Sequence, residues 1–89
     1  IRVSDFNEAL EVAKNTRFQL AGGIVTKDPL KAEKVSNYLQ VGQFSFNGTP
    51  GYRTEAAPFG GFEDSGDGEK EGLILASRMM RRTRVLYKH

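Results

Sequence analysis

The chain has 89 residues, a formal net charge of +2 and no cysteine. The lack of cysteine excludes disulfides, thiolate metal sites and a cysteine nucleophile within this sequence. The composition, 38% hydrophobic and 27% charged, is typical of a globular domain. No apolar run is long enough to span a membrane. The single histidine, His89, is terminal, so no Ser-His pair is expected.

The first part of the chain predicts a helix followed by a strand. Asp5 is a helix cap, and Glu8 follows at the capping-box spacing. Apolar residues at helical spacing form one face: Phe6, Ala9, Leu10 and Ala13. The helix is expected to end near Asn15. Residues 20–26 then read as a buried strand, in which the paired glycines Gly22 and Gly23 indicate close backbone packing.

A second helix and strand follow. Asp28-Pro29 is a cap followed by a first-turn proline, and Gly42 is the expected stop. The apolar face of this helix is Ala32, Val35, Tyr38 and Leu39. Residues 43–47 alternate, with Phe44 and Phe46 on one side and Gln43, Ser45 and Asn47 on the other. That alternation predicts a strand with two different surroundings.

The last part predicts a long loop, a helix and a strand. Residues 48–68 are rich in glycine, and loops of this length in compact domains are usually functional or disordered. Glu69 is the expected start of a helix with this core-facing set: Leu73, Ala76, Ser77 and Met80. Residues 83–88 predict a strand with Val85 and Tyr87 on one side. The alternation of strands and helices favours an α/β fold with a largely parallel sheet.

The most distinctive motif is Pro58-Phe59-Gly60-Gly61-Phe62, followed by Ser65-Gly66 and Gly68. It closely resembles the C-terminal signature of the aldehyde dehydrogenase superfamily, and the resemblance extends to residues 18–24, to residues 41–47 and to the C-terminus. It implies part of a mostly parallel three-layer sheet domain. Residues 1–82 would be the C-terminal part of the catalytic α/β domain, and residues 83–89 the oligomerisation strand.

The resemblance also implies an activity. Such enzymes oxidise an aldehyde to a carboxylic acid with NAD or NADP, using a cysteine nucleophile and a glutamate base. Neither maps onto a residue here, so no catalytic residue is assigned, no cofactor is expected for this chain alone, and the chain alone is expected to be inactive. Because the sequence begins with Ile1, we expect a fragment or a processed product of a cytoplasmic enzyme. The expected partners are the rest of the subunit or a second copy, not nucleic acid or membrane.

Site residues are carried over by motif. Phe59 matches the wall of the aldehyde pocket, although a core aromatic is the plainer interpretation. Gly51 and Tyr52 lie in residues 48–57, which match the segment that shapes the substrate entrance. The structural residues of the motif are Asn47, Pro58, Gly60, Gly61, Ser65 and Gly66. No metal site is expected, because the spacing of the nearby acids matches no calcium loop.

Three features leave alternatives open. Gln19 with Gly22-Gly23 is closer to the pyrroline-carboxylate dehydrogenase branch, but residues 48–57 do not repeat that branch's sequence, so the substrate stays open. The second hypothesis, after the C-terminal portion of a subunit, is a stand-alone association module derived from such an enzyme. The late basic cluster is interpreted as a solvated helix end; the alternative is an RNA-binding domain that uses Arg81, Arg82 and Arg84 with Phe44 and Phe46. Its members are Arg78, Arg81, Arg82, Arg84 and Lys88.

Overall fold

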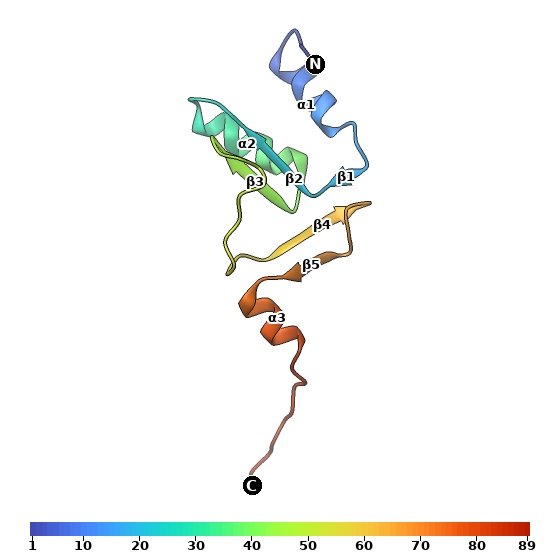
Figure 1. Ribbon diagram of the computed structural model, residues 1–89, viewed down its shortest axis with the longest axis vertical. Coiled ribbons are helices and arrows are strands. Elements are labelled where there is room, and N and C mark those ends of the chain that lie inside the picture. The colour runs from blue at the N-terminus through green and yellow to red at the C-terminus, as the bar shows by residue number, and fades with distance from the viewer.

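The computed structural model describes the backbone of residues 1–89 and the side chains of residues 1–67 and 72–89. The molecule is elongated, with principal extents of 67 × 27 × 24 Å and a Cα radius of gyration of 17.5 Å. A compact chain of this length would have a radius of gyration of about 12 Å. Figure 1 shows the reason, because residues 81–89 run away from the body as a tail.

Both helices of the first half begin at the predicted caps. Helix α1 spans Phe6–Lys14, and the Asp5 side chain accepts a hydrogen bond from the Glu8 N–H at 2.9 Å. Helix α2 spans Pro29–Leu39, and Asp28 caps it through the Leu30 and Lys31 amides. The predicted stop at Gly42 is two residues late, because the chain leaves the helix at Gln40, which has a φ of 44°.

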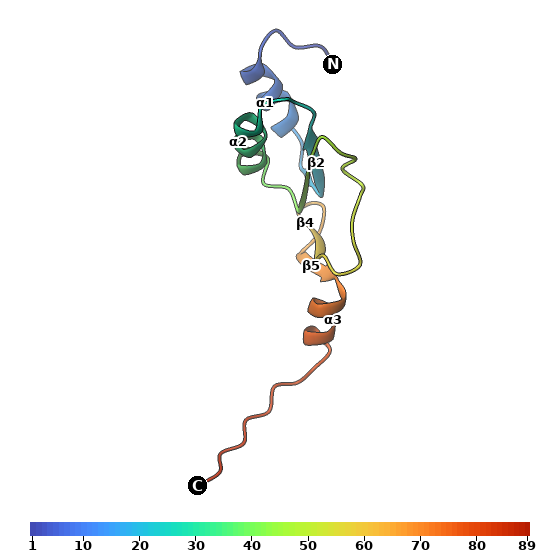
Figure 2. The ribbon, with the colours of Figure 1, turned by 90° about the vertical axis from the view of Figure 1, so that its left-hand side faces the viewer.

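The two helices cover one side of a parallel strand pair. Strands β2 (Ala21–Ile24) and β3 (Gln43–Phe46) pair in parallel, with Ala21 opposite Gln43, and α2 connects them. In Figure 2, α1 and α2 lie on one side of this pair and the segment after β3 lies on the other. The buried hydrophobic side chains among the described residues are Leu10, Ala32 and Val35. The predicted faces of both helices therefore supply the core, except that Ala13 is exposed.

The second sheet is antiparallel, which corrects two predictions. Strands β1 (Phe18–Gln19), β4 (Phe59–Glu63) and β5 (Gly68–Glu71) form a sheet in the order β1-β4-β5. A largely parallel sheet is therefore wrong for this part, and residues 48–68 are not one long loop. Two adjacent glycines disfavour a strand locally. Strand β4 forms because both of its edges find hydrogen-bonding partners.

The final helix and the tail also differ from expectation. Glu69 lies in β5, and α3 spans Leu73–Met79. Of the predicted core-facing residues, Ala76 and Ser77 are half-buried, whereas Leu73 is 66% exposed and Met80 is 87% exposed. Residues 83–88 form no hydrogen-bonded strand. An edge strand needs a neighbouring chain segment to pair with, and no segment lies beside the tail in Figure 1.

Candidate functional site

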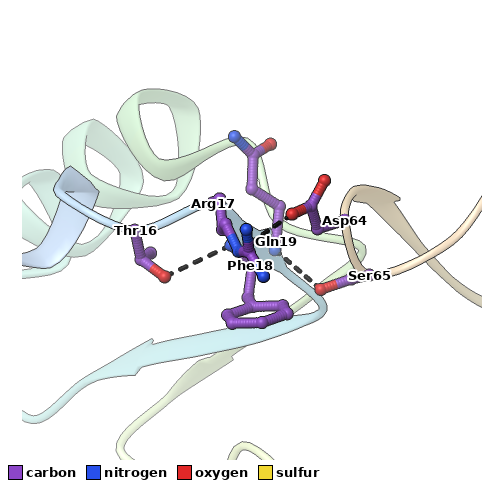
Figure 3. Close-up of polar contacts among 6 residues, drawn as sticks. All are labelled: Thr16, Arg17, Phe18, Gln19, Asp64 and Ser65. Atoms are coloured by element: carbon purple, nitrogen blue, oxygen red, sulfur yellow. Dashed lines mark hydrogen bonds and ion pairs between the residues drawn. The ribbon is translucent and has the colours of Figure 1, made fainter.

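The motif that begins at Pro58 joins the two halves of the chain. The Ser65 hydroxyl accepts a hydrogen bond from the Gln19 N–H at 2.9 Å, across 46 positions of sequence (Figure 3). Beside it, the Asp64 N–H donates to the Arg17 carbonyl at 3.2 Å, and the two side chains form an ion pair at 3.0 Å. That pair is largely exposed, so it is worth less than about 1 kcal/mol. The half-buried Ser65 contact is the more important constraint.

Glycine is required where two backbones meet in this junction. A Cβ at Gly61 would lie 2.6 Å from the Ser65 Cβ and 3.0 Å from the Ser65 carbonyl oxygen. A Cβ at Gly42 would overlap the Gly60 carbonyl oxygen. Gly66 lies between β4 and β5 with a φ of 147°. Glycine at positions 42, 60 and 61 therefore allows β4 to lie against the connection between α2 and β3.

Asn47 closes the parallel strand pair. Its side-chain oxygen accepts from the Thr26 N–H at 2.8 Å, and its amide nitrogen donates to the Thr26 carbonyl at 2.9 Å. Its own N–H donates to the Ile24 carbonyl at 2.8 Å, and its φ is 54°. Asparagine tolerates this left-handed conformation better than most residues. Asn47 therefore sets the direction in which the chain enters residues 48–57.

The polar face of β3 holds residues 48–57. The Gln43 amide donates to the Pro50 carbonyl at 2.8 Å and also to the Tyr52 carbonyl. The Ser45 hydroxyl donates to the Thr49 carbonyl at 3.0 Å. The alternating pattern of β3 predicted a second surrounding for these side chains, and the structure identifies it as this segment. Sequence reasoning did not assign Gln43 a site role.

The predicted substrate residues are only partly brought together. Gly51 lies in a turn, and Tyr52, which is 71% exposed, donates its N–H to the Thr49 carbonyl. Phe59 is half-buried at the start of β4, after the exposed Pro58. The guanidinium of Arg53 lies over the Phe59 ring, 4.3 Å from its centroid. The only signal for this contact in the sequence is the position of Arg53 directly after Tyr52.

A hollow of about 470 Å³ separates residues 53–57 from α3. A backbone hydrogen bond links the two sides of the hollow, since the Leu73 N–H donates to the Glu55 carbonyl at 3.2 Å. The lining combines one cation, one acid and small apolar groups: Arg53, Thr54, Glu55, Ala57, Gly72, Leu73 and Ala76. Such a lining could contact a small polar ligand, but it contains no nucleophile paired with a base.

The perturbed titratable groups lie elsewhere. Hydrogen bonds from Ser4 lower the pKa of the Glu8 carboxyl, and the hydrogen bond from Tyr38 to Glu11 raises the pKa of the tyrosine. Both pairs are on the helical side of the molecule. Within residues 1–67 and 72–89, no three acids or histidines come close enough together to hold a metal ion. None of the described helices is long and apolar enough to cross a membrane.

The basic cluster does not share a surface with the aromatics of β3. Phe44 is half-buried and Phe46 is 48% exposed, both on the strand paired with β2. Residues 81–88 belong to the tail, and Figure 1 places the tail far from β3. The arrangement therefore does not support the RNA-binding alternative.

Known proteins resemble this chain in sequence and in fold. The profile of the aldehyde dehydrogenase family matches residues 1–85. Lactaldehyde dehydrogenase of Methanococcus vannielii is 38% identical over all 89 residues, which cover 19% of that protein. Aldehyde dehydrogenase 21 from Physcomitrella patens, solved with the reaction product succinate, superposes with a TM-score of 0.83 and 39% identity. That match covers 94% of this chain and 17% of the moss protein.

A further solved relative carries a cofactor. Betaine aldehyde dehydrogenase from Staphylococcus aureus, in complex with NAD+, has a TM-score of 0.67 and 36% identity, over 75% of this chain and 13% of that one. The chain therefore spans less than a fifth of these relatives. Because the family profile matches nearly its whole length, this chain belongs to the aldehyde dehydrogenase family.

Proposed function

We propose that this chain is the C-terminal portion of an NAD(P)-dependent aldehyde dehydrogenase subunit, which oxidises an aldehyde to a carboxylic acid. It supplies a wall of the substrate pocket and an oligomerisation strand, and it is not active alone. The observation that carries the proposal is the incomplete core. Only Leu10, Ala32 and Val35 are buried hydrophobic side chains among the described residues, in a molecule with a radius of gyration of 17.5 Å. The large exposed apolar side chains are typical of a surface that contacts further protein.

The wall is formed by Phe59 and the segment that leads to it. Asn47 sets the start of that segment, and Gln43 holds its middle through two carbonyls. A site supported by hydrogen bonds from a strand keeps its geometry better than a free loop does. We therefore assign Phe59 to the pocket wall, with Gly51 and Tyr52 near the entrance.

The cofactor is assigned to the part of a subunit that this chain does not span. A dinucleotide site needs a glycine-rich loop between a parallel strand and a helix N-terminus. Here Gly66 lies in the connection between two antiparallel strands, β4 and β5. That geometry does not fit a pyrophosphate. No step of the reaction is therefore assigned to residues of this chain through the cofactor.

The first test compares the 89-residue chain with the complete gene product. The isolated chain should produce no NADH or NADPH from any aldehyde, because it has no cysteine for the covalent step. The complete product should do so. Turnover by the isolated chain, or none by the complete product, would contradict the proposal.

The second test is Phe59→Ala in the complete enzyme. Loss of a wall aromatic should alter kcat/KM for a bulky aldehyde and a short aldehyde unequally, because it removes contact area and opens space. The KM for NAD(P) should stay unchanged. Phe18→Ala is a suitable control, since Phe18 is an exposed aromatic on β1. Equal changes in kcat/KM for both aldehydes would contradict the assignment of Phe59 to the pocket wall.

A stand-alone association module is the second candidate. Val85, Leu86 and Tyr87 are 67 to 79% exposed in the tail and offer an apolar strand to a partner. The reading frame upstream of the codon for Ile1 separates the two candidates. A start codon there supports the module, whereas a region that encodes a cysteine nucleophile supports the subunit.

A further inference from the structure

We propose that Gln43 is a positioning residue for the substrate entrance, and that its side-chain amide sets the path of residues 49–52. The inference rests on the proposed function, which places Gly51 and Tyr52 near that entrance. It adds the residue that determines where they lie, and this residue belongs to β3 and not to the entrance segment itself. Gln43 acts through the segment and is given no contact with the reacting atoms.

The first observation is that one side chain binds two points of the segment. The Gln43 amide nitrogen donates to the Pro50 carbonyl at 2.8 Å and also to the Tyr52 carbonyl. A side-chain amide has two N–H donors, so both hydrogen bonds can form at once. Gly51, the residue between the two carbonyls, lies in a turn. Glycine is the most flexible residue of the backbone, and here the chain is held on both sides of it.

The second observation is that side chains, not the backbone, join β3 to this segment. The Ser45 hydroxyl, two residues after Gln43 and so on the same face of the strand, donates to the Thr49 carbonyl at 3.0 Å. The Tyr52 N–H donates within the segment, to that same carbonyl. In the described part of the chain, the hydrogen bonds from β3 to residues 49–52 all come from these two side chains. A single substitution on β3 can therefore release the segment without breaking a strand pairing.

The third observation is the room that the neighbouring strand leaves for the segment. Gly23 of β2 lies opposite Ser45, and a Cβ on it would lie 3.2 Å from the Pro50 Cγ. The segment therefore passes over both strands, on the side away from α1 and α2 (Figure 2). The glycine leaves space for the Pro50 ring, and the Gln43 amide binds the carbonyl of the same residue.

These contacts connect the Gln43 amide to the affinity for the aldehyde. A segment that becomes ordered only when a ligand binds costs conformational entropy, whereas a segment ordered in advance does not. Gln43 therefore favours binding by holding the entrance in place before the aldehyde arrives. Its effect is expected on the KM for the aldehyde and not on kcat, because no group of the chemical step is assigned to this chain.

The experiment compares Gln43→Glu with the wild type in the complete enzyme. Glutamate has the shape of glutamine, but its ionised carboxylate has no donor and is repelled by the two carbonyl oxygens. The KM for the aldehyde should rise about tenfold, as expected for the loss of one or two neutral hydrogen bonds, and kcat and the KM for NAD(P) should change less than about twofold. Gln40→Glu makes the same chemical change at an exposed residue where α2 ends, and should leave all three constants unchanged.

A purely structural role predicts a different result. If the two hydrogen bonds only stabilise the subunit, Gln43→Glu lowers the folded fraction, so that the apparent kcat falls and the KM for the aldehyde stays the same. That outcome overturns the inference, while oxidation of the aldehyde by the wild type leaves the proposed function intact. Should Gln43→Glu fail to fold, Gln43→Met, which has neither donor nor charge, replaces it in the same comparison.

Hydrogen exchange separates this inference from the proposed function, because it needs no turnover. In the complete protein, Gln43→Glu should make the backbone amides of residues 49–54 exchange about tenfold faster and leave those of α2 unchanged. If the wild type oxidises no aldehyde but the exchange is faster in the variant, the proposed function fails and Gln43 still positions the segment. Exchange that is unaffected by Gln43→Glu overturns the inference whether or not the protein oxidises aldehydes.

Discussion

Residues 6–47 and residues 48–89 are of nearly equal length, but they pack very differently. The first region contains α1, β1, β2, α2 and β3, and it holds every buried side chain identified: Leu10, Ala32 and Val35. In the second region, the buried residue among those described is Gly61, which has no side chain beyond a hydrogen. The second region instead exposes large apolar groups: Leu73, Ile74, Met79, Met80, Val85, Leu86 and Tyr87.

The difference follows from how the strands of each region are paired and how its apolar faces are covered. A strand, a crossover helix and a parallel strand form a unit whose partners are close in sequence, and α1 covers it. The second region consists of a hairpin, a seven-residue helix and a tail, and many of its large apolar side chains among the described residues are exposed. We infer that the second region is shaped for contact with other protein.

The largest expected effect compares two leucines, both on helices. Leu10 is 7% exposed on α1, and Leu73 is 66% exposed on α3. Leu10→Ala should lower the free energy of unfolding of the isolated chain by about 2–5 kcal/mol, whereas Leu73→Ala should cost less than about 0.5 kcal/mol. Urea denaturation followed by circular dichroism, at dilute concentration, measures both. Equal losses would mean that the second region packs by itself.

The boundary between the regions depends on Asn47. Asn47→Ala removes two side-chain hydrogen bonds to Thr26 and places alanine at a φ of 54°, so unfolding should become easier by about 2–3 kcal/mol. Asn47→Gly removes the hydrogen bonds but tolerates the φ, so its loss should be smaller. Asn37→Ala, on the exposed face of α2, serves as the control. The same urea titration measures the free energy of unfolding of each variant. An unchanged value for Asn47→Ala would mean that the hydrogen bonds to Thr26 do not stabilise the fold.

The tail tests whether the second region pairs with other protein. We expect the isolated chain to form a dimer or larger closed assembly at micromolar concentration through residues 83–88. Val85→Pro should weaken it about tenfold, because proline removes a ladder donor. Val85→Thr keeps the donor and should associate like the wild type. Sedimentation equilibrium measures all three, and a monomeric wild type would falsify strand pairing.

The smallest effect is a pH dependence confined to the first region. Hydrogen bonds from the Ser4 hydroxyl and, to a smaller extent, from the Ser4 N–H lower the pKa of Glu8 from its ordinary 4.5. The ionised carboxylate is therefore favoured in the folded state. Its stabilisation is present above pH 4.5 and is lost as the pH falls through the lowered value. Ser4→Ala should flatten the stability profile in that acidic range, as thermal melts would show. An unchanged profile would mean that the contact adds no stability.

Local signals predicted the first region well because its elements depend on nearby residues. Asp5 and Asp28 cap the helices from within one turn, and the apolar faces found at helical spacing supply the core. In the second region the same reasoning placed a helix start at Glu69 and a loop over β4. The loop error arises because β4 pairs with β1, more than 40 positions earlier in the sequence, and the error at Glu69 arises because β5 pairs with β4.

The candidate site divides in the same way. The glycine motif indicated the family, and the alternation along β3 indicated that Gln43 and Ser45 face something polar. Neither pattern identifies residues 48–57 as that surrounding, nor places the Arg53 guanidinium on the Phe59 ring. Those contacts depend on the path of the segment after Asn47. The assignment of Phe59, Gly51 and Tyr52 to a substrate pocket stays a prediction.

The sequence by itself determined the family, the two capped helices, the strand at residues 43–46 and the lack of a cysteine nucleophile. Each depends on residue identity or on spacing within a few positions. Only the tertiary structure decided the antiparallel β1-β4-β5 sheet, the Ser65 contact with Gln19 and the contact of Arg53 with Phe59. These contacts depend on backbone pairing and on the path of turns, which local side-chain patterns do not encode. They form only when separate segments have been brought together, because each needs a partner that its own neighbourhood cannot supply.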